Sequence, residues 1–231
     1  MERSRNRRSG RDDVPVFKNR TEAGEVLARS LEAYAERGDT VVLGLPRGGV
    51  PVALEVAKAL RAPLDVFIVR KLGVPGREEL AMGAIASGGV RVVNADVVNG
   101  LGIDEVMLDV VARREERELE RRERLYIGDR PPVRLEDKTA IVVDDGLATG
   151  ASMRAAVHGV KEHAPASVMV AVPTAAPEAC AAIARIVDDI VCLQTPEPFY
   201  GVGAWYEDFA QTTDEDVARL LDEAARLEGA A

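Results

Sequence analysis

The stretch from Val142 to Ser152, which reads VVDDGLATGAS, holds the residue types best suited to chemistry in this chain. An apolar predicted strand runs into two adjacent carboxylates, Asp144 and Asp145, and a loop of small residues then opens a predicted helix. Backbone N–H groups and hydroxyls at a helix start bind anions, so the loop over 146–152 can hold a phosphate. The carboxylates beside it can accept hydrogen bonds from sugar hydroxyls or hold a hydrated Mg²⁺. Together these capacities predict a phosphorylated sugar as the ligand.

Other well-known loops do not describe this stretch. The chain contains neither the GxxxxGK[ST] phosphate loop nor the GxGxxG dinucleotide fingerprint. The segment from Gly150 to Arg154 lacks the final glycine of a nucleophile elbow, so no hydrolase serine is implied. A plain turn is the alternative interpretation of two adjacent aspartates, and we predict one for Asp188 and Asp189, where no such loop follows.

Two shorter segments follow other predicted strands. Residues 45–49 read LPRGG, and the glycines would let the backbone approach a phosphate closely. Arg70 and Lys71 end the next predicted strand and would add positive charge. Ligands of open parallel sheets bind at the carboxyl ends of strands, so the three segments are expected to meet at one edge. Taken singly, the short segments are also consistent with a turn and a solvated strand end.

Short apolar runs alternate with helical patterns along most of the chain. This alternation predicts an α/β fold, in which a parallel sheet core is flanked by helices on both faces. Thr21 is the expected N-cap of the first helix. Strands are expected over 40–45, 64–69, 139–143, 167–172 and 190–193, and further helices over 50–60, 151–163, 177–186 and 214–227.

The residues over about 72–138 break this alternation and are predicted to form an insertion. Met82–Ala86 and Val90–Asn94, joined by Ser-Gly-Gly, are typical of a small hairpin. Residues 104–126 are predicted to form a charged helix with a solvated face, in which Glu118 and Arg122 make a favourable i, i+4 pair. The insertion is therefore expected to be a hairpin followed by a charged helix.

Five of the nine aromatic residues lie between Phe199 and Phe209. We expect residues over about 194–212 to form a small C-terminal hood. Trp205 or Tyr206 could stack on a planar ligand, and Phe199 could line the wall of its site. The alternative is that these side chains only pin the C-terminal segment to the sheet.

The 231-residue chain carries a net charge of −9, so general nucleic-acid binding, which needs a basic face, is not expected. No apolar run is long enough to span a bilayer, so no membrane partner is expected either. Residues 1–13 are polar and Arg-rich and are predicted to be a mobile tail before a single domain over 14–231. Cys180 and Cys192 are interpreted as small buried residues of a reduced, cytoplasmic protein.

In their order along the chain, the RGG, RK and DDGLATGAS segments resemble the phosphoribosyl-diphosphate (PRPP) site of type I phosphoribosyltransferases. The resemblance covers roughly residues 14–210 in layout. The runs LPRGGVPVA, VRKLGVPG and GVGAWYEDFAQTTDEDV resemble, more narrowly, bacterial phosphoribosyltransferase-like proteins whose substrate is unassigned. The resemblance implies the type I phosphoribosyltransferase fold.

It also implies an activity, the transfer of the 5-phosphoribosyl group of PRPP to a nitrogen acceptor, with a nucleobase expected, and the release of pyrophosphate. Asp144 and Asp145 would bind the ribose hydroxyls and, directly or through water, the cofactor Mg²⁺. The acceptor would be a small molecule under the hood, and a homodimer is common in the family. Pyrophosphate would bind at Arg47, Gly48, Gly49, Arg70 and Lys71, and the 5-phosphate at Gly146, Leu147, Ala148, Thr149, Gly150, Ala151 and Ser152.

Three rival interpretations share parts of this pattern. A non-catalytic regulator that binds PRPP or a nucleotide would carry the same motif, and only turnover separates it from an enzyme. A receiver-type signalling domain needs its acidic pair near the domain start, whereas this pair lies past the middle. A PRPP-synthesising kinase has a longer, two-domain chain.

Overall fold

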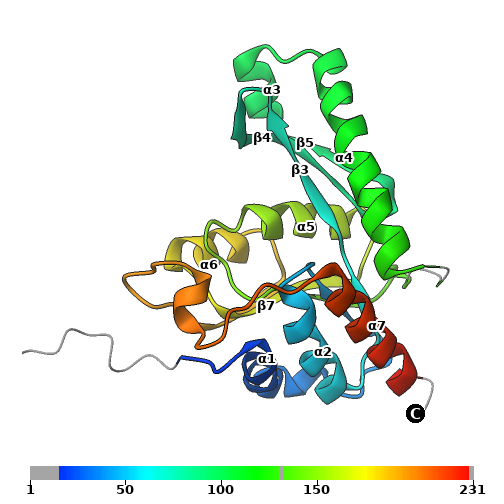
Figure 1. The fold of residues 1–231 in the computed structure, drawn as a ribbon, viewed down its shortest axis with the longest axis vertical. Coiled ribbons are helices and arrows are strands. Elements are labelled where there is room, and N and C mark those ends of the chain that lie inside the picture. The colour runs from blue at the N-terminus through cyan, green and yellow to red at the C-terminus, as the bar shows by residue number, and fades with distance from the viewer. Residues whose placement is uncertain (1–15, 129, 131–132, 229–231) are drawn as a thin grey trace, which may run out of the picture.

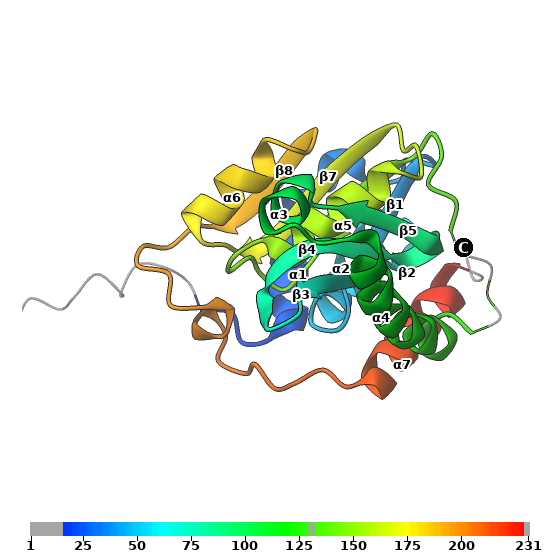
Figure 2. The same cartoon turned by 90° about the horizontal axis from the view of Figure 1, so that it is seen from above.

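The computed structural model describes residues 16–128, 130 and 133–228. Figures 1 and 2 show a core sheet with helices on both faces and a smaller unit above it. The tail predicted over 1–13 lies outside the described residues.

The core of the protein is a five-stranded sheet in which every neighbouring pair of strands is parallel. Its strand order is β2-β1-β6-β7-β8, which confirms the predicted α/β fold. Strands β1 and β6 are buried along their whole length because helices cover both faces of the sheet. The strands span Thr40–Gly44 (β1), Leu64–Val66 (β2), Thr139–Val143 (β6), Ser167–Thr174 (β7) and Asp189–Gln194 (β8).

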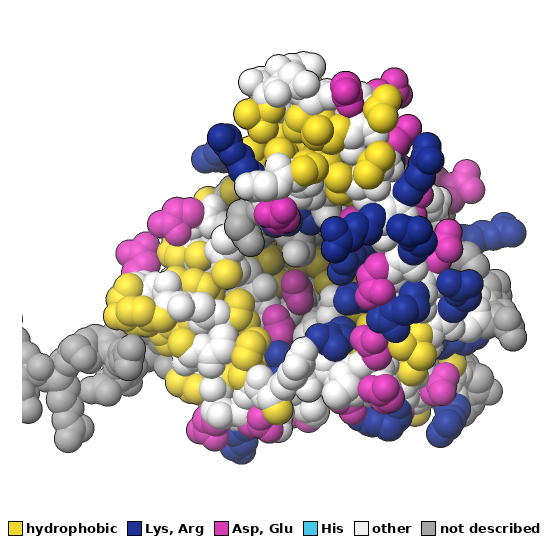
Figure 3. Space-filling view, turned by 45° about the horizontal axis from the view of Figure 1, so that its top comes forward, with side chains coloured by type: hydrophobic (Ala, Val, Ile, Leu, Met, Phe, Trp, Pro, Cys, Tyr) yellow, Lys and Arg dark blue, Asp and Glu magenta, His cyan; other side chains and the backbone are white. Residues whose placement is uncertain are grey.

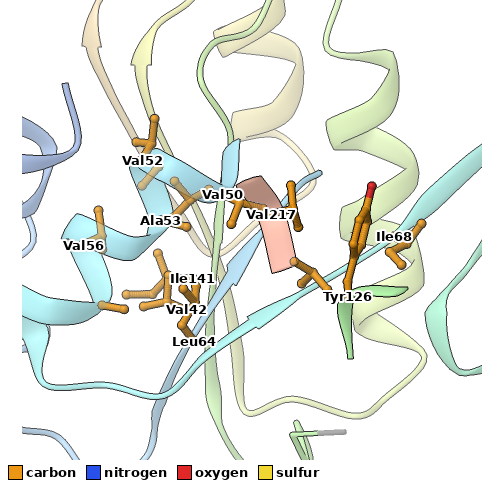
Figure 4. Close-up of a cluster of buried hydrophobic side chains, with 14 of the residues drawn as sticks. Val42, Val50, Val52, Ala53, Val56, Leu64, Ile68, Tyr126, Ile141 and Val217 are labelled. Carbon is orange, nitrogen blue, oxygen red and sulfur yellow. The ribbon is translucent and has the colours of Figure 1, made fainter. Parts of the chain in front are cut away.

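Alternating side chains of the strands build a separate apolar core on each face. On β1, Val42 packs with helices α1, α2 and α7, whereas Val41 and Leu43 pack with α5 and α6. Figure 4 shows side chains of α2, Ala53 among them, lying over Val42 and Ile141 of the sheet. The helices span Arg20–Arg29 (α1), Gly49–Leu60 (α2), Ala151–Lys161 (α5), Pro177–Ala184 (α6) and Asp214–Glu228 (α7).

The N-cap of α1 differs from the prediction. Asn19, not Thr21, caps the helix, and its side chain accepts a hydrogen bond of 3.0 Å from the backbone N–H of Glu22. The backbone of Phe17 is held in two hydrogen bonds, from its N–H to Trp205 and from Glu207 to its carbonyl. The C-terminal segment thus anchors the residues just before α1. This long-range contact cannot be predicted from the residues around Thr21 alone.

The predicted strand over 64–69 is confirmed only over residues 64–66, because the chain leaves the core sheet after Val66. Phe67 and Ile68 lead into a second, antiparallel sheet with the order β3-β4-β5. Ile68 is held there by Ser87, whose hydroxyl accepts from the Ile68 N–H at 3.1 Å and whose N–H donates to the Ile68 carbonyl at 2.9 Å. The predicted hairpin is present, and its first strand is longer than expected. The strands span Val69–Val74 (β3), Arg77–Ala86 (β4) and Val90–Val93 (β5).

Two helices complete this insertion, and Figure 1 shows it stacked over α5. Helix α3 (Ala95–Leu101) was not predicted, and α4 (Glu105–Tyr126) confirms the charged helix. The Glu118–Arg122 pair forms with an N···O distance of 2.8 Å. The end of α4 reaches α7, where the Tyr126 hydroxyl donates to Asp214 at 2.6 Å. The insertion is therefore tied to the core at both of its ends.

None of the helices in the described part of the chain combines the length and the apolar character that crossing a bilayer requires.

The structure corrects the interpretation of the cysteines. Cys180 of α6 and Cys192 of β8 are joined by a disulfide, with their Cα atoms 6.7 Å apart. When a helix packs on a sheet and is followed by a parallel strand, the residues of the helix come to lie beside that strand. Twelve positions of sequence separation therefore bring the two side chains together, and neither is an unlinked thiol.

Gly159 marks the closest approach of α5 to the insertion. A Cβ at this position would lie 2.9 Å from the Cβ of Ala86 and 2.9 Å from Cε1 of Phe67. We expect Gly159→Leu to lower the free energy of unfolding by about 1–3 kcal/mol, because overpacking forces the two units apart. Urea unfolding followed by circular dichroism measures this change.

Gly100→Leu in α3 is the matched control, because nothing lies within 4 Å of a Cβ at that position. Leucine has the higher helix propensity, so this variant should be as stable as the unaltered protein or slightly more stable. Equal losses in both variants would contradict the packing argument.

Candidate functional site

The carboxyl ends of β1 and β6 meet at one edge of the core sheet. Their parallel register pairs Gly44 with Val143, and the N–H of Leu45 donates to the carbonyl of Val143 at 2.9 Å. The RGG loop therefore leaves the sheet beside Asp144. Figure 3 shows a hollow between the core and the insertion, with acidic side chains inside it and Lys and Arg side chains along one flank.

The two aspartates lie in a setting that disfavours their charge. Burial, and then the negative charge of Asp145, raise the pKa of Asp144 well above its ordinary value. Burial also raises the pKa of Asp145, although the positive charge of Arg20 acts in the opposite direction. The N–H of Asp145 donates to the Asp144 carboxylate at 2.9 Å, which fixes one carboxylate relative to the other. A ligand that brings hydrogen-bond donors or positive charge would stabilise the charged form of such a pair.

The helices that begin at this edge present uncapped N-termini. Helices α1, α3 and α4 are capped by the side chains of Asn19, Asn94 and Asp104. Helices α2 and α5 have glycines at the N-cap, Gly48 and Gly150, which have no side chain with which to cap them. The first N–H groups of α2 donate to carbonyls of the preceding loop, but a helix start carries partial positive charge, so both starts are suited to binding phosphates.

The loop predicted to hold the 5-phosphate divides into an anchor and an exposed part. Gly146 and Leu147 are buried, and the N–H of Leu147 donates to the carbonyl of Thr174 at 3.0 Å. Gly150 adopts a left-handed conformation, with φ of 69°, which turns the chain into α5. Ala148, Thr149, Ala151 and Ser152 are exposed, so they are the positions that a ligand can reach.

Glycines are required in the loop predicted to hold pyrophosphate. A Cβ on Gly48 would collide with the Asp145 carboxylate, and one on Gly49 would lie 2.7 Å from the carbonyl oxygen of Val143. The structure thus explains both glycines by the close approach of this loop to β6. Arg47 Nη1 lies 3.7 Å from a carboxylate oxygen of Asp214, at the start of α7.

The Arg70–Lys71 pair does not lie where it was predicted. Both residues are inside β3 of the second sheet and not at the end of a core strand. Arg70 Nε donates to Glu115 of α4 at 2.9 Å, and Lys71 is exposed. The break after Val66 causes this difference, since it moves the pair from the core sheet to the insertion.

The predicted hood residues lie in two different environments. Trp205 and Tyr206 are only 7% and 6% exposed and pack with Phe17 and Ala23 in a small apolar cluster. The Tyr206 hydroxyl donates to the backbone carbonyl of Asp145 at 2.6 Å. Neither ring offers an open face for stacking in this structure, so the pinning alternative describes both.

Phe199, the third predicted hood residue, lines an open cleft of about 800 Å³. The cleft runs from the exposed part of the phosphate loop, at Ala148 and Thr149, to Tyr200 and Gly201. A ligand held by its phosphate at the loop could therefore extend along the wall that Phe199 forms.

Arg20 is a site residue that the sequence did not reveal. It is the first residue of α1, and its Nε donates to Asp145 Oδ2 at 2.8 Å. A basic residue in the first turn opposes the helix dipole, which is the one local signal that could have indicated a special role.

Asp144 and Asp145 are the carboxylates of this site that could take part in holding Mg²⁺. Among the described residues, no group of three or more His, Cys, Asp or Glu side chains is placed to hold a metal ion. Asp144 and Asp145 nevertheless fit the usual manner of Mg²⁺ binding, in which one or two carboxylates act with waters and substrate phosphates.

The raised pKa of Asp144 leads to a stability prediction in the presence of EDTA. Both folded and unfolded chains hold Asp144 protonated below the unfolded pKa of about 3.9, so the carboxyl imposes no penalty there. As the pH rises from the unfolded pKa to the higher folded pKa, the unfolded chain ionises first, which lowers the stability of the folded state. We expect Asp144→Asn to raise the free energy of unfolding by about 1 kcal/mol at pH 8 and to have no such effect at pH 4.

Urea unfolding from pH 4 to pH 8 tests this expectation. Asp188→Asn, in the turn before β8, is the control, because Asp188 is exposed and its side chain accepts from the Val168 N–H, away from the site. A gain from Asp144→Asn that is the same at every pH would contradict the electrostatic origin.

Comparisons with known proteins identify the family of the chain. The model of the family described as "Phosphoribosyl transferase domain" matches residues 18–203. The chain is 47% identical over 213 residues to "Putative phosphoribosyl transferase Rv0571c" of Mycobacterium tuberculosis H37Rv, which covers 92% of this chain and 48% of that protein. The chain thus spans about half the length of the curated relatives it matches. The crystal structure of TT1426 from Thermus thermophilus is 42% identical, with a TM-score of 0.80, and covers 90% of this chain and 98% of that one. The chain belongs to the phosphoribosyl transferase domain family, as its motifs and fold indicate.

Proposed function

We propose that the protein transfers the 5-phosphoribosyl group of PRPP to a nitrogen acceptor and releases pyrophosphate. One observation carries this proposal. Two uncapped helix starts, those of α2 and α5, flank a pair of adjacent carboxylates at a single edge of the sheet. PRPP has the matching chemistry, with a phosphate group at each end of a ribose that bears hydroxyls.

The two ends of PRPP would bind at different loops. The 5-phosphate would lie at the exposed part of the 146–152 loop, where Thr149 and Ser152 add hydroxyls to the N–H groups of α5. The pyrophosphate would lie at the RGG loop, beside Gly48 and Gly49 and the start of α2, where Arg47 supplies positive charge. Asp144 and Asp145 would accept hydrogen bonds from the ribose hydroxyls between these two ends.

Mg²⁺, when bound with PRPP, would neutralise charge on the leaving pyrophosphate. In the proposed reaction, the bond between ribose C1 and the pyrophosphate oxygen breaks, and a bond from C1 to the acceptor nitrogen forms. Positive charge builds on C1 and negative charge on the pyrophosphate. The residues described above would act by position and charge, and none of them needs to form a covalent bond with the substrate.

The acceptor would occupy the cleft that Phe199 lines. This cleft of about 800 Å³ is continuous with the phosphate loop at Ala148 and Thr149. Its lining includes two aromatic rings, which could stack on a planar nucleobase, and two glutamates, which could accept hydrogen bonds from it. The nucleobase class is part of the proposal.

The first test is calorimetric titration of PRPP into the protein, with and without Mg²⁺. We expect binding that needs Mg²⁺ and that weakens at least tenfold in Asp144→Asn and in Asp145→Asn, because each loses a charged acceptor of ribose hydroxyls. Asp188→Asn is the control outside the site. Absence of binding to the unaltered protein at millimolar PRPP would overturn the proposal. Binding without pyrophosphate release for any nucleobase would favour a regulatory protein instead.

The second test concerns Arg47. We expect Arg47→Ala to weaken the binding of Mg²⁺-pyrophosphate at least tenfold, because it removes a charge-assisted contact. The free energy of unfolding should fall by less than about 1 kcal/mol, since the 3.7 Å contact to Asp214 is partly solvated. Calorimetry and urea unfolding of the same sample measure both quantities. A large loss of stability with unchanged pyrophosphate binding would contradict the role of Arg47.

A further inference from the structure

The Arg20 side chain is largely enclosed by groups from two distant parts of the chain. Its side chain is 12% exposed, and its Nε donates to Asp145 Oδ2 at 2.8 Å. Its Nη1 donates to the carbonyl of Ala210 at 2.8 Å, and its guanidinium lies 3.9 Å from the centre of the Phe209 ring. The Arg20 fork thus joins α1, the carboxylate at the end of β6 and the C-terminal hood segment.

Stability alone is a poor explanation for this arrangement. Desolvating both partners of an ion pair offsets much of their attraction, and the Asp145 side chain is only 14% exposed. A positive charge in the first turn of α1 also opposes the helix dipole. Replacement by apolar residues would often be neutral for stability at such a place.

The location of the pair indicates a role in ligand binding. A Cβ on Gly48 would collide with the Asp145 carboxylate and would lie 3.3 Å from Arg20 Nε. Arg20 therefore borders the RGG loop as well as the carboxylate. The backbone of Asp145 is held from the other side by the Tyr206 hydroxyl, at 2.6 Å. Asp145 is fixed by its main chain and by one of its two carboxylate oxygens.

We infer that Arg20 is a positioning residue, which holds Asp145 Oδ2 so that Oδ1 accepts a hydrogen bond from a ribose hydroxyl. This inference rests on the proposed function, because it assigns the ribose to Asp145. It adds that selection of a hydroxyl-bearing sugar phosphate over other phosphates depends on a residue of α1. It also predicts that the hood segment, through Ala210 and Phe209, is ordered together with the ribose site.

The test compares two probes, ribose 5-phosphate and inorganic phosphate, by calorimetry. Their affinity ratio reports what the sugar hydroxyls contribute, since both probes can occupy the phosphate loop. We expect Arg20→Gln to reduce this ratio about tenfold, the effect of one lost charge-assisted hydrogen bond, and to leave the affinity for inorganic phosphate unchanged within about twofold. Arg29→Gln, which removes an exposed arginine from the other end of α1, should change neither affinity.

Each other outcome has a distinct meaning. Equal weakening of both probes by Arg20→Gln would show that Arg20 acts only as a general positive charge, and an unchanged ratio would show that it positions nothing; either overturns the inference. If the unaltered protein does not prefer ribose 5-phosphate, the proposed function fails and the inference fails with it.

Should Arg20→Gln melt below the assay temperature, Arg20→Lys replaces it. Lysine keeps the charge but cannot bridge Asp145 and Ala210 with a planar fork, so the ratio should still fall at least threefold, and a ratio equal to that of the unaltered protein would overturn the inference.

Discussion

The parallel pairing of β1 with β6 is the constraint on which the rest of the structure depends. Because Gly44 lies opposite Val143, the segments that follow β1 and β6 leave the sheet at the same edge and at the same height. Each strand is followed by a glycine-containing loop and then by a helix. The starts of α2 and α5 therefore point at one place, and the two aspartates lie between them. A different register would separate the phosphate loops from the carboxylates and remove the match to a ligand with phosphate at both ends.

This arrangement gathers groups that are unfavourable without a ligand. Two carboxylates are adjacent and desolvated, which raises the pKa of both, and two helix starts lack side-chain caps. The helix dipoles and Arg20 offset part of the negative charge. Under the proposed function, a bound sugar phosphate would supply hydroxyl donors for the carboxylates and negative charge for the two helix starts.

The insertion contributes to the site through its helix α4. Its last turn and Arg121 hold Asp214, since the Tyr126 hydroxyl donates to that carboxylate at 2.6 Å and Arg121 Nη2 donates at 3.1 Å. The hydrogen bond from Tyr126, followed by that from Arg121, lowers the pKa of Asp214, which keeps it ionised beside Arg47. The antiparallel sheet and α3 place this helix, so a unit that lies outside the core influences the charge next to the RGG loop.

The sequence by itself determined the local parts of this protein. The strand, the paired aspartates and the small-residue loop form one contiguous stretch over 142–152. The RGG loop and the hairpin at 82–94 are likewise each a single contiguous segment. Short apolar runs and glycines record such units directly, and they were sufficient to identify the core fold and the family. The tertiary structure alone decided the break after Val66, the disulfide between Cys180 and Cys192, the burial of Trp205 and the place of Arg20. Arg20, for example, pairs with Asp145, which is 125 positions away in the sequence. Periodicity within a segment carries no information on such contacts, because they depend on which surfaces the packed sheet and helices bring together.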